Sequence, residues 1–229
     1  MKRSLKVIGL IAIVGLLASC RKDKDQEFTE ADAVDVVSAS LSDTGESIMD
    51  FAKTTDEETV NFESAQCGAI ISFTRGWEGN NGNRSFTYDA TGTRENICVD
   101  NVFTQANINS SFSTTFNGPR YESTGNGTRG GMLSGFNTSD SFYTWNGSSE
   151  KTANGLLINQ DVNVSTSKST ESTIFIDKES HEITGGNSTF SVTGSGDNGN
   201  AFTHNGTVEF LGDRSAIITI NGNSTTVSW

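Results

Sequence analysis

The chain ends in the sequence SAIITINGNSTTVSW (residues 215–229), and this stretch decides the fold. Asn221-Gly222 supplies two neighbouring residues that tolerate positive φ, as a two-residue type I′ hairpin turn requires. The β-branched residues on both sides of this pair disfavour a helix. The pattern therefore predicts antiparallel strands over 215–220 and 224–228, with Ile218 and Val227 on the buried face.

The same signals recur upstream and predict a larger sheet. Apolar and polar residues begin to alternate near residue 69, and separate strands are expected over 71–77, 85–88 and 95–99. A four-residue turn over 177–180 is expected to pair Ile174 with Ile183 and Ile176 with His181. We therefore expect a mainly β protein, an antiparallel meander that forms a curved sheet or a partly open barrel. Asn-Gly pairs, read as further hairpin turns, begin at Asn81, Asn117, Asn126, Asn146, Asn154, Asn198, Asn205 and Asn221.

Composition and charge narrow the classes of function. The 229 residues include 28 acids and 16 bases, so the formal net charge is −12. This balance argues against a nucleic-acid partner, because binding to a phosphate backbone needs a basic surface. Glycine occurs 24 times, proline once, and hydrophobic residues make up only 33% of the chain. Such a composition favours many turns and half-buried strands around a thin core.

The first twenty residues have the features of a bacterial export signal. Three bases within residues 1–6 precede an apolar run over residues 7–17, which is too short to cross a membrane as a helix. The run leads into LASC (residues 17–20), which resembles the lipobox of bacterial lipoproteins. The resemblance implies cleavage before Cys20, a diacylglycerol on its sulfur and a further acyl chain, such as palmitate, on its amine. An ordinary secretory signal with an incidental cysteine is the alternative.

The residues that follow indicate where such a lipoprotein would reside. Cleavage after residue 19 would remove three bases and no acid, leaving 13 bases against 28 acids, a formal charge of −15. Arg21 follows the cysteine, where an aspartate would indicate retention in the inner membrane, so the outer membrane is favoured. Residues 20–28 are expected to form a charged tether. They also resemble the acidic surface-export signals of Bacteroidota lipoproteins, although lysines interrupt the acidic run, so the membrane leaflet stays open.

Residues 29–63 are predicted to form an acidic helical segment. Thr29 and Asp32 have the spacing of a capping box, and Val34, Val37 and Leu41 follow as one helical stripe. The helix is expected to end at 42–45, with a second short helical turn near 48–52. We expect a short helix laid against the main domain or the tether, with its acidic face in solvent. A partner-binding helix is the alternative.

Two cysteines remain once Cys20 is set aside. An even pair in an exported chain favours a disulfide between Cys67 and Cys98, with Cα atoms within about 7 Å. A redox-active pair is disfavoured because the two residues do not form a C-x-x-C motif.

No motif identifies a catalytic or cofactor site. His181-Glu182 does not continue into a zinc-protease motif, and no cluster has zinc-ligand spacing, so we expect no metal and no cofactor. His204 is a serine-orienting candidate only if Asp197 or Glu209 lies beside it. Residues 197–200 are rich in oxygen ligands but lack the EF-hand spacing, so a turn is favoured over a calcium site.

Aromatic residues offer a binding hypothesis and a competing structural one. Six of them either line an exposed face that stacks on sugars or fill the interior of a chain poor in aliphatic residues, and the interior is favoured. These residues are Trp77, Tyr88, Tyr121, Tyr143, Trp145 and Trp229.

The chain is therefore read as a signal peptide (1–19), a tether (20–28), an acidic helical segment (29–63) and an antiparallel β domain (64–229). It resembles small envelope lipoproteins of Bacteroidota, a resemblance that carries no activity. We expect a lipid-anchored protein of the cell envelope that acts by binding or display, with a glycan, a protein or a hydrophobic ligand as partner. A carrier that shelters a lipid in a concave sheet and an envelope hydrolase with two convergent acids are the alternatives.

Overall fold

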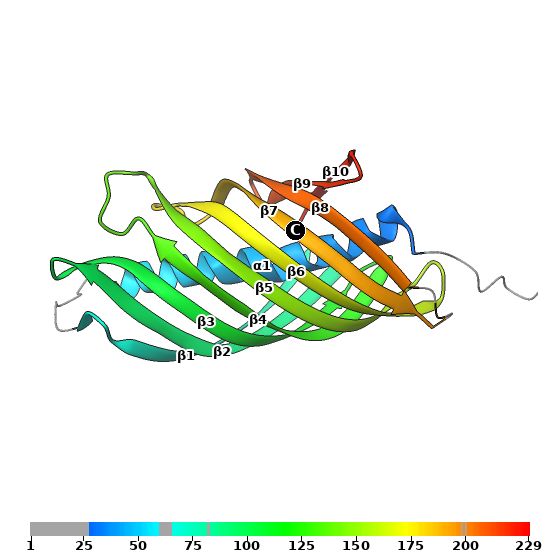
Figure 1. Cartoon of the computed structure of the whole chain (residues 1–229), viewed down its shortest axis with the longest axis horizontal. Helices are drawn as coiled ribbons and strands as arrows, with labels where there is room; N and C mark the ends of the chain where they lie inside the picture. Colours follow the sequence, from blue (N-terminus) through cyan, green and yellow to red (C-terminus); the bar gives the residue numbers. More distant parts are fainter. Residues whose placement is uncertain (1–27, 60–65, 82, 198, 200) are drawn as a thin grey trace, which may run out of the picture.

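The computed structural model describes residues 28–59, 66–81, 83–197, 199 and 201–229. The predicted signal peptide, Cys20 and nearly all of the tether lie outside these residues. These residues form one helix and ten strands, arranged as an elongated molecule (Figure 1). The elements are α1 (Glu30–Thr59), β1 (Ile70–Asn81), β2 (Arg84–Val99), β3 (Val102–Asn117), β4 (Tyr121–Ser134), β5 (Phe142–Leu157), β6 (Val162–Asp177), β7 (Ile183–Gly196), β8 (Ala201–Gly212), β9 (Ser215–Ile220) and β10 (Asn223–Ser228).

The strands form one antiparallel meander, as predicted. Each strand pairs with its neighbours in the chain, in the order β1 to β10, and the sheet is not closed into a barrel. The strands are long: β2, β3, β5 and β6 each contain 16 residues, whereas about five or six is typical. The predicted separation of 85–88 from 95–99 is wrong, because both segments belong to the single strand β2.

The terminal hairpin confirms the register argument. Ile218 pairs with Thr225 and Ala216 with Val227, and the turn residues Asn221 and Gly222 have φ values of 50° and 84°. Ile218 is fully buried, and Val227 is half-buried on the same face. β10 begins one residue earlier than predicted, at residue 223.

Four of the Asn-Gly pairs within the described residues do not form turns. The pairs that begin at residues 126, 146, 154 and 205 lie inside strands β4, β5 and β8. Gly127 instead lies opposite Phe112, and Gly206 lies opposite Phe190. A Cβ on either glycine would come within 2.4 Å or 2.6 Å of the facing ring's Cζ atom. These glycines therefore provide space for an aromatic ring from the neighbouring strand, a pairing that protects the glycine backbone.

The connection between β6 and β7 also differs from the prediction. Ile176, not Ile174, pairs with Ile183, and the register shifts between Phe175 and Ile176. The turn is longer than four residues because Asp177 organises it locally. Its Oδ1 accepts hydrogen bonds from the backbone N–H groups of Glu179 and Ser180, at 3.0 Å and 2.8 Å.

The concave side of the sheet is occupied by the helix. Figure 1 shows α1 running along the inside of the curved sheet. The predicted capping box is present: the Thr29 N–H donates to Asp32 at 2.8 Å, and the Asp32 N–H donates to Thr29 Oγ1 at 3.3 Å. The expected end of the helix at 42–45 is wrong, because α1 is one helix of 30 residues. No helix within the described ranges is long and apolar enough to cross a membrane.

Gly45, at the predicted break, is a packing site. A Cβ on this residue would lie 2.9 Å from Nε1 and 3.2 Å from Cε2 of Trp229. The indole therefore rests directly on the helix backbone, and it also meets the Phe210 ring edge-on at 5.9 Å. The packing of Trp229 explains why a glycine occupies this position, although glycine lowers the stability of a helix by about 1 kcal/mol relative to alanine.

The acidic side chains of α1 are not a free solvated face. Asp35 pairs with Arg120 at 2.7 Å, Glu46 with Arg214 at 2.7 Å, and Asp50 with Arg75 at 3.3 Å. These arginines come from a loop or strand of the sheet, so the ion pairs attach the helix along its length. Burial raises the pKa of Asp35, Glu46 and Asp50, and the paired arginine opposes this rise in each case. This half-burial corrects the expectation of a short helix with its acids in water.

Polar side chains also fill the space between helix and sheet. Ser38, Ser40 and Ser47 of α1 are buried. Arg129 of β4 is only 3% exposed, and it hydrogen-bonds to Ser47, to Thr44 at 3.2 Å and to Tyr88 at 3.3 Å. The core is therefore a mixed interior, in which buried polar side chains lie among the apolar ones.

Candidate functional site

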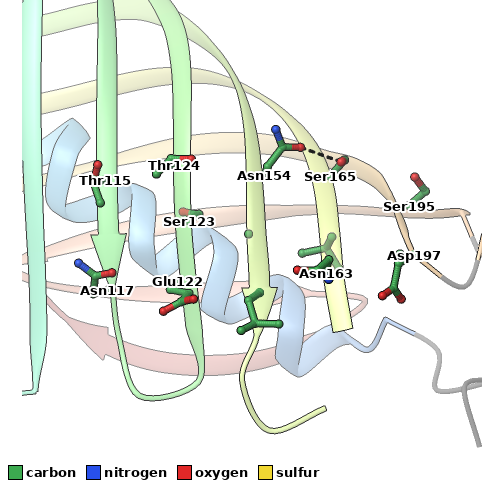
Figure 2. Close-up of a pocket in the computed structure, with 14 residues that line it drawn as sticks. Thr115, Asn117, Glu122, Ser123, Thr124, Asn154, Asn163, Ser165, Ser195 and Asp197 are labelled. Carbon is green, nitrogen blue, oxygen red and sulfur yellow. Dashed lines mark hydrogen bonds between the residues drawn. The ribbon is translucent and has the colours of Figure 1, made fainter. Parts of the chain in front are cut away.

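A wide groove crosses the outer face of the sheet, on the side away from α1. It consists of a hollow of about 600 Å³ and an adjoining one of about 550 Å³, which share five lining residues. Figure 2 shows the first hollow, with side chains from β3 to β7 projecting from the outer surface. We call the two hollows together the outer groove. The five shared residues are Thr115, Thr124, Asn154, Ser165 and Ser195.

The shared residues form one straight row across five strands. Thr115 pairs with Thr124, Thr124 with Asn154, Asn154 with Ser165, and Ser165 with Ser195. Neighbouring side chains in such a row stand about 4.8 Å apart, which is the spacing between strands. A second row runs parallel to the first, two residues further along each strand, and contains Ser113, Asn126, Thr152, Ser167 and Thr193.

The groove exists because the sheet is strongly coiled beneath it. A twisted sheet is saddle-shaped, so each of its faces is hollow along one diagonal. Gly125 and Gly194 lie beneath the groove, and a Cβ on either would point to the inner face, 2.8 Å from Ala153 Cβ and 2.7 Å from Phe202 Cζ, respectively. A Cβ at these positions would come within 2.6 Å of the Thr152 carbonyl oxygen and 2.2 Å of the Ser165 carbonyl oxygen, respectively.

The lining of the outer groove consists mostly of polar, uncharged residues, with Leu156, Val164 and Ala153 as its larger apolar members. Its hydroxyl and amide groups both donate and accept hydrogen bonds, and Ser165 Oγ donates to Asn154 Oδ1 at 2.8 Å (Figure 2). Among the described lining residues none is basic or aromatic, and Glu122 and Asp197 supply the only carboxylates. This chemistry suits a neutral, hydroxyl-rich ligand and does not suit a nucleic acid or a lipid chain.

The two carboxylates are widely separated. Glu122 lies near the start of β4, and Asp197 directly follows β7. Strands β5 and β6 lie between them. Three interstrand steps amount to about 14 Å. Paired carboxylates that hydrolyse a glycosidic bond stand about 5–9.5 Å apart.

The two histidines lie elsewhere. His204 is on the inner face of β8, with its ring centroid 5.7 Å from that of Phe28, whereas Glu209 projects from the outer face of the same strand. His181 Nε2 lies 3.2 Å from Asp56 Oδ2, and Asp56 also accepts a hydrogen bond from the Tyr143 hydroxyl. Burial and the Asp56 carboxylate raise the pKa of Tyr143 above its ordinary value. This cluster joins the end of α1 to the β6–β7 turn.

The other residues that the sequence singled out have structural roles or lie outside the described chain. Cys67 and Cys98 are disulfide-bonded, with Cα atoms 5.6 Å apart, as predicted. Among the described residues, no group of three or more His, Cys, Asp or Glu side chains is placed to hold a metal ion. Of residues 197–200, Asn198 and Asn200 lie outside the described chain. The interior placement of the aromatic residues is confirmed: five are buried, and Trp77 is half-buried against Tyr88 at a ring distance of 4.1 Å.

Comparison with known proteins identifies neither a family nor a function for this chain. Family models, curated proteins and solved structures were each searched, and none matches this chain.

Proposed function

We propose that the protein is a lipid-anchored lipoprotein of the bacterial envelope whose outer groove binds a neutral glycan. The observation that carries the ligand class is the row of five hydroxyl and amide side chains, with a parallel second row beside it. Such a surface offers many weak donors and acceptors at regular spacing to a polyhydroxylated chain. The anchor rests on the lipobox at residues 17–20, and the outer membrane is its favoured location.

Binding is favoured over the two alternatives on geometric grounds. The separation of Glu122 from Asp197 disfavours glycoside hydrolysis in the groove. A lipid carrier needs an apolar cavity of several hundred Å³, but α1 occupies the concave face and the large hollows have polar linings. A carrier function would therefore require α1 to leave the sheet.

The groove is tested by a paired substitution. Thr124→Ala with Asn154→Ala should weaken binding to a neutral glycan, identified on an array, by about 5- to 150-fold, since two hydrogen bonds contribute about 1–3 kcal/mol. The matched control is Asn205→Ala with Thr207→Ala, which removes the same groups from the exposed outer face of β8. Isothermal titration of the detergent-solubilised protein measures both. Equal loss in both variants, or binding restricted to charged glycans, would contradict the proposal.

The anchor is tested separately. Cys20→Ala should abolish palmitate labelling and leave the protein either in the aqueous phase or with its signal peptide uncleaved, because the lipid acceptor is gone. Labelling that persists in the variant would exclude Cys20 as the lipid acceptor and would leave the groove proposal untouched.

A further inference from the structure

A small cavity lies between α1 and the first strands of the sheet, away from the outer groove. Its volume is about 190 Å³. It lies between the last turns of α1 and the strands at the β1 edge of the sheet. Four apolar side chains line one part of it: Phe51 from α1, Ile71 and Phe73 from β1, and Ile108 from β3. Phe51 and Phe73 meet edge-on at 5.3 Å and form a firm apolar wall.

The cavity is also positively charged, and its cationic groups lie beside the apolar wall, since Arg75 Cζ is 5.9 Å from the centre of the Phe73 ring. Arg75 and Arg94 project into it from neighbouring strands. The Arg94 side chain is only 7% exposed, and its Nε donates to Asn96 Oδ1 at 3.1 Å, which fixes the direction of the guanidinium. Asp50 lies beside Arg75 Nε at 3.3 Å, so part of the positive charge of Arg75 is balanced from α1.

Glu58 is the only side chain that brings a carboxylate to both guanidinium groups among the described residues. Its Oε2 lies 2.7 Å from Arg94 Nη1, and its Oε1 lies 3.8 Å from Arg75 Nη2. The Glu58 side chain is 44% exposed and belongs to the final turn of α1. It is therefore a half-solvated group that neutralises a nearly buried arginine, a position that an external carboxylate is also suited to fill.

We infer that this cavity binds a small organic carboxylate with an apolar body. The carboxylate of the ligand replaces that of Glu58 between Arg75 and Arg94, and Glu58 turns outward into solvent. The apolar body then packs against the wall that Phe51 and Phe73 form. A cavity of about 190 Å³ suits a short chain or a single ring. This inference concerns a different site from the outer groove and does not depend on it.

The competition between Glu58 and the ligand provides the decisive test. Sodium hexanoate is titrated into the full-length protein in detergent, followed by calorimetry and by chemical-shift changes of residues around the cavity. Hexanoate should bind, and hexanamide, its neutral counterpart, should bind at least about tenfold more weakly. Glu58→Gln should tighten hexanoate binding at least about fivefold, because the arginines are no longer occupied by an internal competitor. Glu57→Gln is the matched control, since Glu57 is 62% exposed and pairs only with Lys53 within the described residues.

Removal of the cationic groups tests the other half of the site. Arg94→Gln should abolish hexanoate binding, but Arg94 also contacts Thr55 and Asn96, so its loss affects packing as well. Arg75→Gln, at a side chain that is 30% exposed, is therefore made in parallel and should weaken binding while an unchanged circular dichroism spectrum shows that the fold is retained. Equal affinity for hexanoate and hexanamide, equal effects of the Glu57 and Glu58 substitutions, or no binding to Glu58→Gln would each overturn the inference.

Discussion

Trp229→Ala should lower the free energy of unfolding by about 3–5 kcal/mol, the range for truncation of a large buried aromatic side chain. The side chain is 8% exposed and lies between Phe210 and the backbone of α1 at Gly45. Loss of the indole removes apolar contacts and opens a cavity where α1 meets the final hairpin. Urea denaturation followed by circular dichroism measures the change, because tryptophan fluorescence is itself altered by the substitution.

Gly45→Ala supplies the matched test of this contact. In an ordinary helix this change stabilises by about 1 kcal/mol. Here the new Cβ would lie 2.9–3.3 Å from three atoms of the rigid indole, so we expect destabilisation by about 1–3 kcal/mol. In the Trp229→Ala background the same substitution should become stabilising. If Gly45→Ala stabilises the protein with Trp229 intact, the described contact does not exist in solution.

Loss of the Cys67–Cys98 disulfide has the second large expected effect. The bond closes a loop between residues 31 positions apart, and constraint of the unfolded chain by such a loop contributes about 3–4 kcal/mol. The double variant Cys67→Ser with Cys98→Ser should lose that amount relative to the oxidised protein. A double variant is needed because a single substitution leaves a reactive free thiol.

The structural consequence of that loss should be local. β1 pairs with β2 alone, since it is the first strand in the order of the sheet, and the disulfide joins the residues just before β1 to the end of β2. Amide hydrogen exchange should therefore accelerate in β1 before it does in β5 or β6. Identical urea midpoints with and without reductant would contradict the stabilising role of the bond.

Features governed by neighbours in the chain could be predicted from the sequence. The terminal hairpin depends on Asn221-Gly222 and on the β-branched residues beside it, so its register followed from local rules. The capping box at Thr29 and Asp32 is likewise local. The Cys67–Cys98 pair followed from there being only two candidates once Cys20 was set aside.

Features governed by distant residues could not be predicted. Gly45 indicated a helix break, but the indole that occupies its place lies 184 positions away, from residue 45 to residue 229. Gly127 and Gly206 indicated turns, but each faces a ring on the preceding strand in space. The acids of α1 indicated a solvated face because the arginines that pair with them are scattered over the sheet.

The outer groove also had no signal in the linear sequence. Its first row takes one residue from each of five strands, so the row emerges only when the register of every pair is known. A segment rich in Ser and Thr, such as 165–169, does not by itself indicate which of its side chains share a face with those of other strands. The hollow itself follows from the coiling of the sheet, which the alternation of side chains does not encode.

The enclosure of α1 has a consequence for the order in which the chain acquires its structure. Glu30 accepts hydrogen bonds from Asn221 and Asn223, 191 and 193 positions away. Gly45 packs against the indole of Trp229. During synthesis α1 is therefore made early, whereas the terminal hairpin that contacts Glu30 and Gly45 is made last. Most contacts in the sheet join strands that are neighbours in the chain, so the enclosure of α1 is the step that depends on distant residues. We expect the strands to pair in order along the chain and α1 to acquire its full cover only when the final hairpin is available.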